Sequence, residues 1–395
     1  MLVVEYPIIL DPHSLKSYVG RNEDALLLYT ERYVERALFT GKKVIIINPP
    51  PRGKFFVKQA KAQTIREVFS IIHRLIKADE KPDIVMICQI EKLDQGKNYF
   101  DIVKQYRSLQ FIVDKGIQVL VFGQDINGDE VPVISTSLCI GMSDSVYKLS
   151  RATDIKRPGR IYVRTGPMGA NKTAGLFELY HNALDLGCKP YVAKPLKDTR
   201  SDQIRDRHGN VVPHDSRPDS LLELIDIIKT HHKNRSPFIV DESQFLDYDD
   251  KIDEKPRPSQ RRSLLINQTR ILEFCRKINI LLKKNIKIFF YCLDMDFERK
   301  AWLTSSMLIG KSFKTTKQVA ACEWCFNDGA HHSKQIVSGL KGAYQPGELF
   351  RACCRHCFHK KSPPLNIKTK KLSFSQSIEK KDTLKPKQKV NMVLL

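Results

Sequence analysis

The sequence has no apolar run long enough to cross a bilayer. The apolar stretch at residues 115–123 is far shorter than the roughly 18 to 20 residues that a membrane-spanning helix needs. The start of the chain also lacks the pattern of a signal peptide, because it is short, acidic and interrupted by Pro7. These absences predict a soluble protein of a reducing, cytoplasmic compartment, with free thiols and no membrane partner.

Acidic residues are few: 44 Asp and Glu stand against 66 Lys and Arg, and the formal net charge is +22. Part of this excess falls in residues 361–395, where nine Lys accompany only Glu379 and Asp382. Such a segment cannot bury enough apolar surface to order itself, so we expect a disordered basic tail. A solubilising extension is favoured over a polyanion-binding arm, and nucleic acid is not the expected partner.

Four of the ten cysteines form two CxxC units. Cys322 and Cys325 lie in Cys-Glu-Trp-Cys, and Cys354 and Cys357 lie in Cys-Arg-His-Cys. Two residues between cysteines let both thiolates of a turn reach one ion, and two such turns complete a tetrahedral shell. The spacing predicts a closed, structural Zn²⁺ site. Cys353 leaves open which neighbouring thiol is a ligand, and reduced pairs or a disulfide are the alternatives.

Continuous Ile and Val runs separated by helix-length segments are typical of strands buried on both faces of a parallel sheet. The expected strands are residues 42–48, 83–88, 117–122, 160–164, 189–193, 237–240 and 286–293, and the expected helices are 60–77, 173–186 and 272–284. A chain of 395 residues is long enough for two domains. The polar segment 152–159, closed by Arg-Pro-Gly, is the expected linker.

Two parts of the chain echo each other. Residues 116–125 run parallel to 285–294, and 83–94 can be laid over 237–247 when their terminal Leu-Asp pairs are matched. Under that overlay Cys88 stands where Asp241 does, and Gln89 stands where Glu242 does. The pattern predicts an internal duplication, with two unrelated α/β domains as the alternative.

The expected strand at 160–164 runs into Gly-Pro-Met-Gly-Ala-Asn-Lys-Thr at residues 166–173. In a phosphate loop the glycines let backbone N–H groups face the phosphates, the Lys neutralises them, and the hydroxyl binds Mg²⁺. Lys172 and Thr173 fill the last two positions. Asn171 replaces the usual glycine, and Asn tolerates left-handed backbone better than other residues with a side chain.

Asp241 and Glu242 follow the apolar strand expected at 237–240. Their carboxylates are therefore expected at the carboxyl edge of the sheet, where open α/β sheets bind ligands. Asp241 is expected near Mg²⁺, and Glu242 is expected to accept a proton from an attacking hydroxyl. The alternative interpretation is a helix cap after a strand.

These motifs occur in a characteristic order with two others, Lys-Asp-Thr-Arg at 197–200 and Leu-Asp-x-x-Phe-x-Arg-Lys at 293–300. Together with the paired CxxC units they resemble the type II thymidine kinases, the cytosolic and viral group. The resemblance covers about residues 160–360. It implies a RecA-like P-loop parallel sheet and a small zinc-bearing lasso over the base.

The resemblance also implies roles for individual residues. ATP and Mg²⁺ would be bound by Gly166, Pro167, Met168, Gly169, Ala170, Asn171, Lys172, Thr173, Asp198, Asp241 and Gln244. Glu242 would be the general base on the 5′-hydroxyl of the nucleoside. The thymine pocket would be formed by Met168, Phe245, Phe297, Trp302 and Phe350. Trp302 stands where the family usually has Phe, and Phe350 replaces a tyrosine, so a hydroxyl contact is lost.

The predicted organisation is a degenerate kinase-like domain at 1–151, a linker at 152–159, a P-loop core at 160–320, a zinc-binding lasso at 321–360 and a tail at 361–395. The first domain is expected to lack a phosphate loop, because residues 6–16 occupy that region without a Gly-rich Lys-Ser/Thr unit. The Pro-rich and charged stretch 247–268, which contains Arg261 and Arg262, is expected to be a solvated loop.

The predicted reaction is ATP-dependent phosphorylation of thymidine or deoxyuridine by a homo-oligomer in which the first domain is a scaffolding pseudo-subunit. The alternative is a catalytically silent nucleotide-binding homologue that acts through regulation or interaction. Asn171 and Phe350 favour that alternative, whereas Lys172, Asp241 and Glu242 oppose it. A basic zinc protein that binds nucleic acid is a third reading, and it gives no reason for the Asp-Glu pair.

Overall fold

The computed structural model describes residues 14–20, 23–93, 99–149, 159–199, 201–206, 208–231, 236–247, 258–336 and 349–360. The predicted linker, apart from Gly159, and the predicted tail lie outside the described residues, as does Arg200 of the Lys-Asp-Thr-Arg motif. Below, the first half means residues 14–149, the second half means 159–320, and the zinc segment means 321–336 and 349–360.

The first half is built on a six-stranded parallel sheet with the strand order β3-β2-β4-β5-β1-β6. Its strands are β1 (Leu15–Val19), β2 (Val44–Ile47), β3 (Lys58–Ala60), β4 (Ile84–Ile87), β5 (Gln118–Gly123) and β6 (Ser145–Lys148). Its helices are α1 (Glu23–Phe39), α2 (Ile65–Lys77), α3 (Tyr99–Asp114) and α4 (Ile134–Met142), with a short 3₁₀ turn, η1 (Ile90–Lys92).

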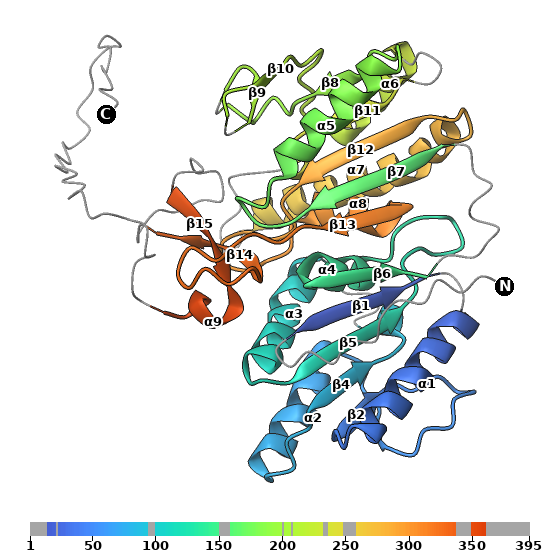
Figure 1. Ribbon diagram of the computed structural model, residues 1–395. Helices are drawn as coiled ribbons and strands as arrows, with labels where there is room; N and C mark the ends of the chain where they lie inside the picture. Colours follow the sequence, from blue (N-terminus) through green and yellow to red (C-terminus); the bar gives the residue numbers. More distant parts are fainter. Residues whose placement is uncertain are drawn as a thin grey trace.

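Both faces of this sheet are covered by helices (Figure 1). Ile45 and Ile47 of β2 pack into one core with residues of α2, α3 and α4. Val44 and Ile46 point to the opposite face and pack into a second core with residues of α1. A strand buried on both faces reads as a continuous apolar run rather than an alternating one, which is the pattern that predicted the sheet.

The second half is built on a five-stranded parallel sheet with the order β13-β7-β12-β11-β8. Its strands are β7 (Arg160–Thr165), β8 (Tyr191–Ala193), β11 (Phe238–Val240), β12 (Lys287–Cys292) and β13 (Lys314–Lys317). Its helices are α5 (Lys172–Asp185), α6 (Leu221–His231), α7 (Pro258–Leu282) and α8 (Leu303–Lys311), with the 3₁₀ turn η3 (Ser243–Phe245) and the hairpin of β9 (Ile204–Arg205) and β10 (Val211–Val212).

Two local predictions were wrong. Helix α7 begins at Pro258, well before the expected start, so Arg261 and Arg262 lie in a helix rather than in a loop. The region that would carry the phosphate loop of the first half is not 6–16, because β1 extends from Leu15 to Val19 and the loop would have to follow this strand, before α1 begins at Glu23. Strand β1 escaped prediction because it contains Lys16 and Ser17, both of which are nevertheless buried.

The two sheets share one strand order. Five strands of the first sheet have the order β6-β1-β5-β4-β2, and the second sheet has the matching order β13-β7-β12-β11-β8. Details match as well. The bridge between Ile126 and Pro132 recurs between Met295 and Ala301 at the same sequence interval. The left-handed Gln89 precedes η1 as the left-handed Glu242 precedes η3.

The two halves meet through α4 and α8, while the edge strands β6 and β13 lie side by side (Figure 1). The helix contact is close and reciprocal. A Cβ added at Gly141 would lie 2.3 Å from Ser306 Oγ, and one added at Gly310 would lie 2.6 Å from Ser137 Oγ. Glycine is therefore required on each helix where the other helix presents a serine.

The zinc segment contains the antiparallel strands β14 (Ala330–Gln335) and β15 (Phe350–Cys354) and the short helix α9 (Arg355–Phe358). It lies beside the ends of both sheets (Figure 1). None of the helices in the described parts of the chain has the length and apolar character needed to span a bilayer.

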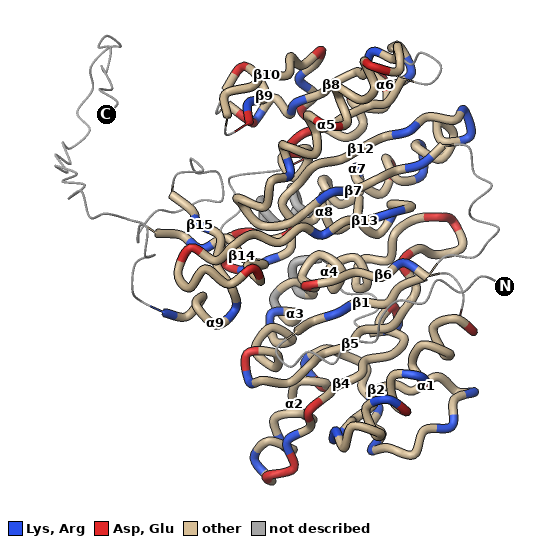
Figure 2. The backbone as a smooth tube through the Cα atoms, in the orientation of Figure 1, with Lys and Arg blue, Asp and Glu red and all other residues tan. Residues whose placement is uncertain are grey.

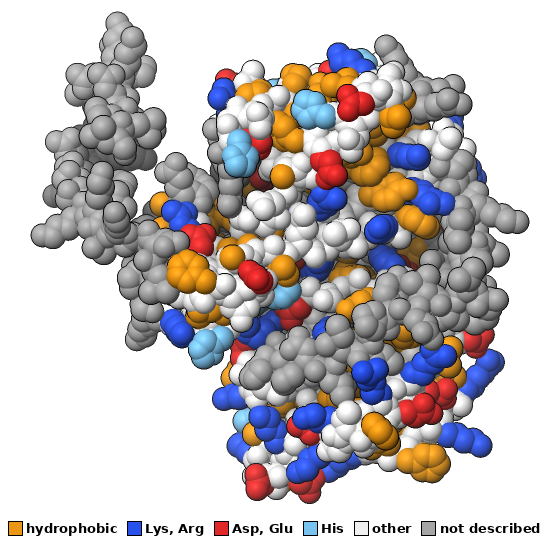
Figure 3. Space-filling model, viewed as in Figure 1, with side chains coloured by type: hydrophobic (Ala, Val, Ile, Leu, Met, Phe, Trp, Pro, Cys, Tyr) orange, Lys and Arg blue, Asp and Glu red, His pale blue; other side chains and the backbone are white. Residues whose placement is uncertain are grey.

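Charged side chains are spread over both halves. Lys and Arg are interspersed with Asp and Glu along the backbone (Figure 2). On the face shown in Figure 3, basic side chains lie scattered among apolar and acidic ones. The positive net charge of the chain therefore does not gather into one basic surface on this face.

We predict that Gly141→Val lowers the free energy of unfolding by about 1–3 kcal/mol, the usual cost of overpacking a close contact. The added atoms would meet Ser306 and Ala301 of the other half. Gly128→Val is the matched control, because a Cβ at Gly128 has no neighbour within 4 Å. Urea unfolding measures both, and equal effects of the two substitutions would contradict the predicted contact.

Candidate functional site at the carboxyl edge of the second sheet

The loop 166–171 joins β7 to α5 and has the backbone that its glycines predict. Gly166 and Gly169 have φ values of 145° and 81°, and Asn171 has a φ of 54°. Asn171 is also the residue directly before α5, in the left-handed conformation. The residue that replaces the usual glycine therefore adopts the conformation for which glycine is normally selected.

Lys172, the first residue of α5, turns back over this loop. Its Nζ donates hydrogen bonds to the carbonyl oxygens of Gly166 at 3.0 Å and Pro167 at 2.8 Å. Burial lowers the pKa of the Lys172 ammonium, and the carboxylates of Glu242, Asp294 and Asp241 oppose that shift. The structure thus brings together the predicted phosphate-binding lysine and the acidic ends of two strands.

Asp241 and Glu242 follow β11 at the carboxyl edge of the sheet. The backbone N–H of Asp241 donates to the carbonyl of Ala193 at 3.0 Å, which ties this turn to the end of β8. Glu242 has a φ of 46°. Gln244 Nε2 donates to Glu242 Oε2 at 2.5 Å, and Gln244 Oε1 accepts from the N–H of Leu293 at 3.0 Å. Gln244 therefore orients the Glu242 carboxylate against the end of β12.

Asp198 lies on the turn after β8 and is buried. Its carboxylate lies 3.5 Å from the Nζ of Lys194, and both side chains are 3% exposed. Lys194 also donates to the carbonyl of Ser201. Sequence reasoning did not single out Lys194, although its position directly after an apolar strand placed it at the same edge.

Asp294 is a second side chain that sequence reasoning did not assign to the site. It follows β12, is 4% exposed, and pairs with Lys317 at 3.0 Å. The signal was available, because Asp294 ends a strand in the same way as Asp241 does. Its lysine partner could not be found from the sequence, since it comes from β13, which β7 separates from β12 in the sheet.

The predicted aromatic residues form two separate pairs. Phe245 and Trp302 meet edge to face with ring centroids 5.8 Å apart. Phe297 and Phe350 lie 5.6 Å apart, and this pair joins the turn after β12 to strand β15 of the zinc segment. The backbone N–H of Met168 donates to Ser333 Oγ of β14 at 2.9 Å, so the zinc segment also contacts the loop 166–171.

The four predicted cysteines come together. The sulfur atoms of Cys322, Cys325, Cys354 and Cys357 all lie within 4.8 Å of one another, and the Sγ atoms of Cys325 and Cys354 are 3.7 Å apart. Tetrahedral zinc at about 2.3 Å from each sulfur requires sulfur separations of about 3.8 Å. The cluster therefore fits a closed zinc site.

Cys353 does not belong to this cluster. It is fully buried, its Sγ donates to the carbonyl oxygen of Cys354 at 3.3 Å, and burial raises the pKa of its thiol. The alternation of β15 explains the difference, because consecutive side chains of a strand point to opposite faces.

Comparison with known proteins decides the family. The family model described as thymidine kinase matches residues 159–261 and 263–358, which together make up half of the chain. The chain belongs to the thymidine kinase family. This family supports a nucleoside kinase function for the second half and the zinc segment, where all of the predicted site residues lie.

Similar proteins carry the same name. The chain is 30% identical over 217 residues to a thymidine kinase of Ureaplasma urealyticum, covering 85% of that protein and 53% of this chain. It is 28% identical over 229 residues to thymidine kinase 1 of Dictyostelium discoideum, covering 88% of that protein and 55% of this chain. The family match begins at residue 159, after the first half.

We expect about one zinc ion per chain, measured by elemental analysis of protein purified without chelator. Cys354→Ser should lower zinc content severalfold, because it removes one of the four sulfur ligands. Cys353→Ser is the matched control and should keep the metal, since Cys353 lies outside the cluster. Equal zinc loss in the two variants would contradict the assignment of the ligands.

The conformation of Asn171 leads to a second prediction. A β-branched residue is disfavoured at positive φ, so Asn171→Val should lower the free energy of unfolding by about 1–2 kcal/mol. Asn171→Gly should retain or increase stability, because glycine adopts this conformation without strain. Thermal unfolding without ligand measures both variants, and a glycine variant less stable than the valine variant would count against a left-handed Asn171.

Proposed function

We propose that this thymidine kinase family member transfers the γ-phosphoryl group of ATP to the 5′-hydroxyl of thymidine or deoxyuridine. The observation that carries the proposal is that Lys172, at the start of α5, and the carboxylates that follow β11 and β12 lie at one edge of the sheet, where Asp241, Glu242 and Asp294 act electrostatically on the Lys172 ammonium. A phosphate-binding lysine and a carboxylate base at the same edge are the parts that phosphoryl transfer requires, since catalysis depends on positioning and charge stabilisation.

In this proposal the loop 166–171 and Lys172 bind the phosphates of ATP, with help from Thr173 and Gln244. The ammonium of Lys172 exchanges its two carbonyl partners for phosphate oxygens, which are stronger acceptors because they are charged. Thr173, Asp198 and Asp241 would hold Mg²⁺, which neutralises charge on the phosphates when it is bound. Lys194 pairs with the Asp198 carboxylate and holds it in place.

Glu242 is the proposed general base. Its carboxylate is oriented by Gln244, and it lies on the site side of the sheet, near the ammonium of Lys172. It would accept the proton of the nucleoside 5′-hydroxyl as that oxygen attacks the phosphorus. Met168, Phe245, Phe297, Trp302 and Phe350 would form the walls that bind the thymine ring, and zinc would hold the segment that carries Phe350.

For the first half we propose a degenerate copy of the same domain that serves as a built-in partner, with boundaries at 1–151, 160–320 and 321–360. The shared strand order and the reciprocal contact of α4 with α8 support a common origin. In the described residues of the first half, the positions that match the proposed site differ. Gln89 occupies the position of Glu242, and only residues 21 and 22 separate Gly20 from α1.

A catalytically silent homologue is the second candidate, and Asn171 and Phe350 are the features that favour it. Purified full-length protein incubated with Mg-ATP and each deoxynucleoside separates the two candidates. Appearance of thymidine monophosphate supports the kinase, whereas ATP binding without product supports the silent homologue. We further propose that the protein acts in the cytoplasm as a homo-oligomer, a state that sedimentation tests.

We predict that Glu242→Gln lowers kcat by about 10² to 10⁴, the usual contribution of a positioned base, while the KM for ATP changes little. The first half carries glutamine at the matching left-handed position, Gln89, so glutamine is accommodated by this backbone. Glu178→Gln, exposed on α5, is the control and should keep full activity. Steady-state kinetics measure both variants. An unchanged kcat in Glu242→Gln would show that Glu242 is not the base.

A further inference from the structure

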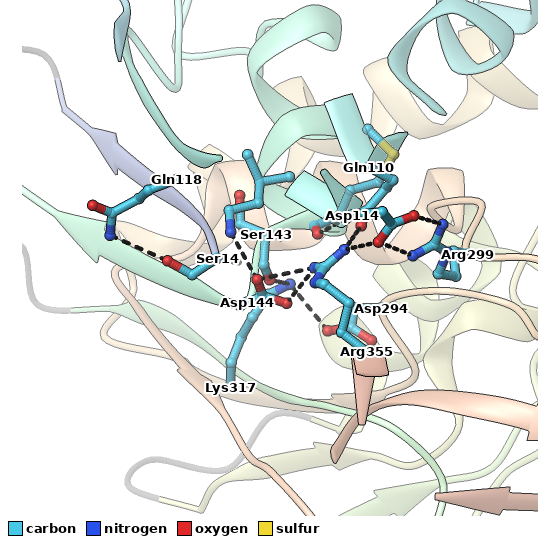
Figure 4. Close-up of polar contacts among 12 residues, drawn as sticks. Ser14, Gln110, Asp114, Gln118, Ser143, Asp144, Asp294, Arg299, Lys317 and Arg355 are labelled. Atoms are coloured by element: carbon cyan, nitrogen blue, oxygen red, sulfur yellow. Dashed lines mark hydrogen bonds and ion pairs between the residues drawn. The ribbon is translucent and has the colours of Figure 1, made fainter. Parts of the chain in front are cut away.

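A polar cluster joins the halves, in which Asp114 and Asp144 of the first half face Arg299 and Arg355 of the rest of the chain (Figure 4). Both carboxylate oxygens of Asp144 lie 3.0 Å from Nη2 of Arg355. Nη1 of Arg355 donates to Gln110 and, at 3.3 Å, to Asp114. Asp114 also accepts two hydrogen bonds from Arg299, at 3.0 Å and 2.7 Å.

The two arginines belong to the two elements that carry the proposed nucleoside pocket. Arg355 directly follows the zinc ligand Cys354 and begins α9. Arg299 lies in the turn closed by the bridge between Met295 and Ala301, two residues after Phe297. The rings of Phe297 and Phe350 then join these two elements to each other.

The side chains of this cluster are largely shielded from solvent, so their contacts are well defined. The side chains of Asp144 and Arg355 are 6% and 11% exposed, and those of Asp114 and Arg299 are 16% and 12% exposed. Burial alone would raise the pKa of Asp114, but the ion pairs with Arg299 and Arg355 outweigh it and hold the pKa below its usual range. Charged hydrogen bonds of this kind are strong and directional.

This cluster breaks the symmetry of the contact between the halves. Two lysines, by contrast, make reciprocal contacts: Lys148 donates to the carbonyl of Gly310 at 2.7 Å, and Lys317 donates to that of Gly141 at 2.8 Å. At the same sequence interval, Asp144 corresponds to Phe313 and Asp114 corresponds to Lys283. The acids are therefore found only on the first half, at the point where it faces the zinc segment.

We propose that the first half is a positioning subunit, in which Gln110, Asp114 and Asp144 hold the zinc segment and the turn 295–301 in the arrangement that closes the nucleoside pocket. The inference rests on the proposed kinase function of the second half. It assigns a defined task to the first half, whose sequence carries no Gly-rich Lys-Ser/Thr unit. The three residues act through Arg299 and Arg355 and do not touch the substrates.

The test uses the full-length chain with Asp144→Asn. This change keeps the acceptor for the N–H of Leu15, which Asp144 Oδ2 binds at 2.7 Å, and removes the charge that faces Arg355. The KM for thymidine should rise about tenfold or more, because small displacements of positioning groups have large kinetic effects. The factor by which the KM for ATP changes should be at least five times smaller than the factor for thymidine. Zinc content should stay unchanged.

Hydrogen exchange provides a readout that does not need activity. Amides of residues 349–360 and 297–301 should exchange faster in Asp144→Asn, while those of β2 should not change. Arg355→Gln should produce the same changes to at least the same extent, because it also removes the contacts with Gln110 and Asp114. The double variant should be no worse than Arg355→Gln alone, because Asp144 acts through Arg355. Asp79→Asn, an exposed acid of the first half, is the control of equal charge.

Each outcome decides. Selective loss of thymidine affinity and selective exchange in the two named segments support the positioning role. Exchange that rises equally in β2, or a variant that behaves like Asp79→Asn, overturns it. If the unmodified chain phosphorylates no nucleoside, the proposed function fails, while hydrogen exchange still determines whether Asp144 holds the zinc segment.

Discussion

Lys148 and Lys317, whose side chains are 10% and 5% exposed, set the relation between the halves on which the rest of the structure depends. Lys148 pairs with Asp125 of its own half and donates to a carbonyl of α8. Lys317 pairs with Asp294 and donates to the carbonyls of Gly141 and Ser143. A buried ammonium is costly unless a charge and further acceptors satisfy it, so each lysine requires the opposite half to be in place.

This requirement links the contact between the halves to the proposed chemistry. Asp294, the partner of Lys317, is one of the carboxylates that act on Lys172. Ser143, whose carbonyl Lys317 also binds, directly precedes Asp144, which holds Arg355 of the zinc segment. The first half therefore borders the proposed site on two sides, through β13 and through the zinc segment, without contributing any residue to the proposed phosphate site.

The sequence predicted the strands that are buried on both faces, because an uninterrupted run such as Val44–Ile47 has few alternatives. It also indicated the four cysteines that come together and the family to which the second half belongs. It failed for β1, where Ser17 is buried through a hydrogen bond to Ser143, far along the chain. It also failed for the start of α7. The charged residues and prolines before Gln268 favoured a loop, whereas the helix begins at Pro258.

Local chemistry, then, was decided by the sequence: which residue could adopt the left-handed turn at Asn171, which thiols were spaced for one metal, and which carboxylates would end a strand. Tertiary structure alone decided which charges meet. Lys317 reaches Asp294 from β13, two strands away from β12 in the sheet, and Arg355 reaches Asp144 across the contact between the halves. Such pairs depend on the packing of α4 against α8, and no local pattern in the chain records how two helices will pack.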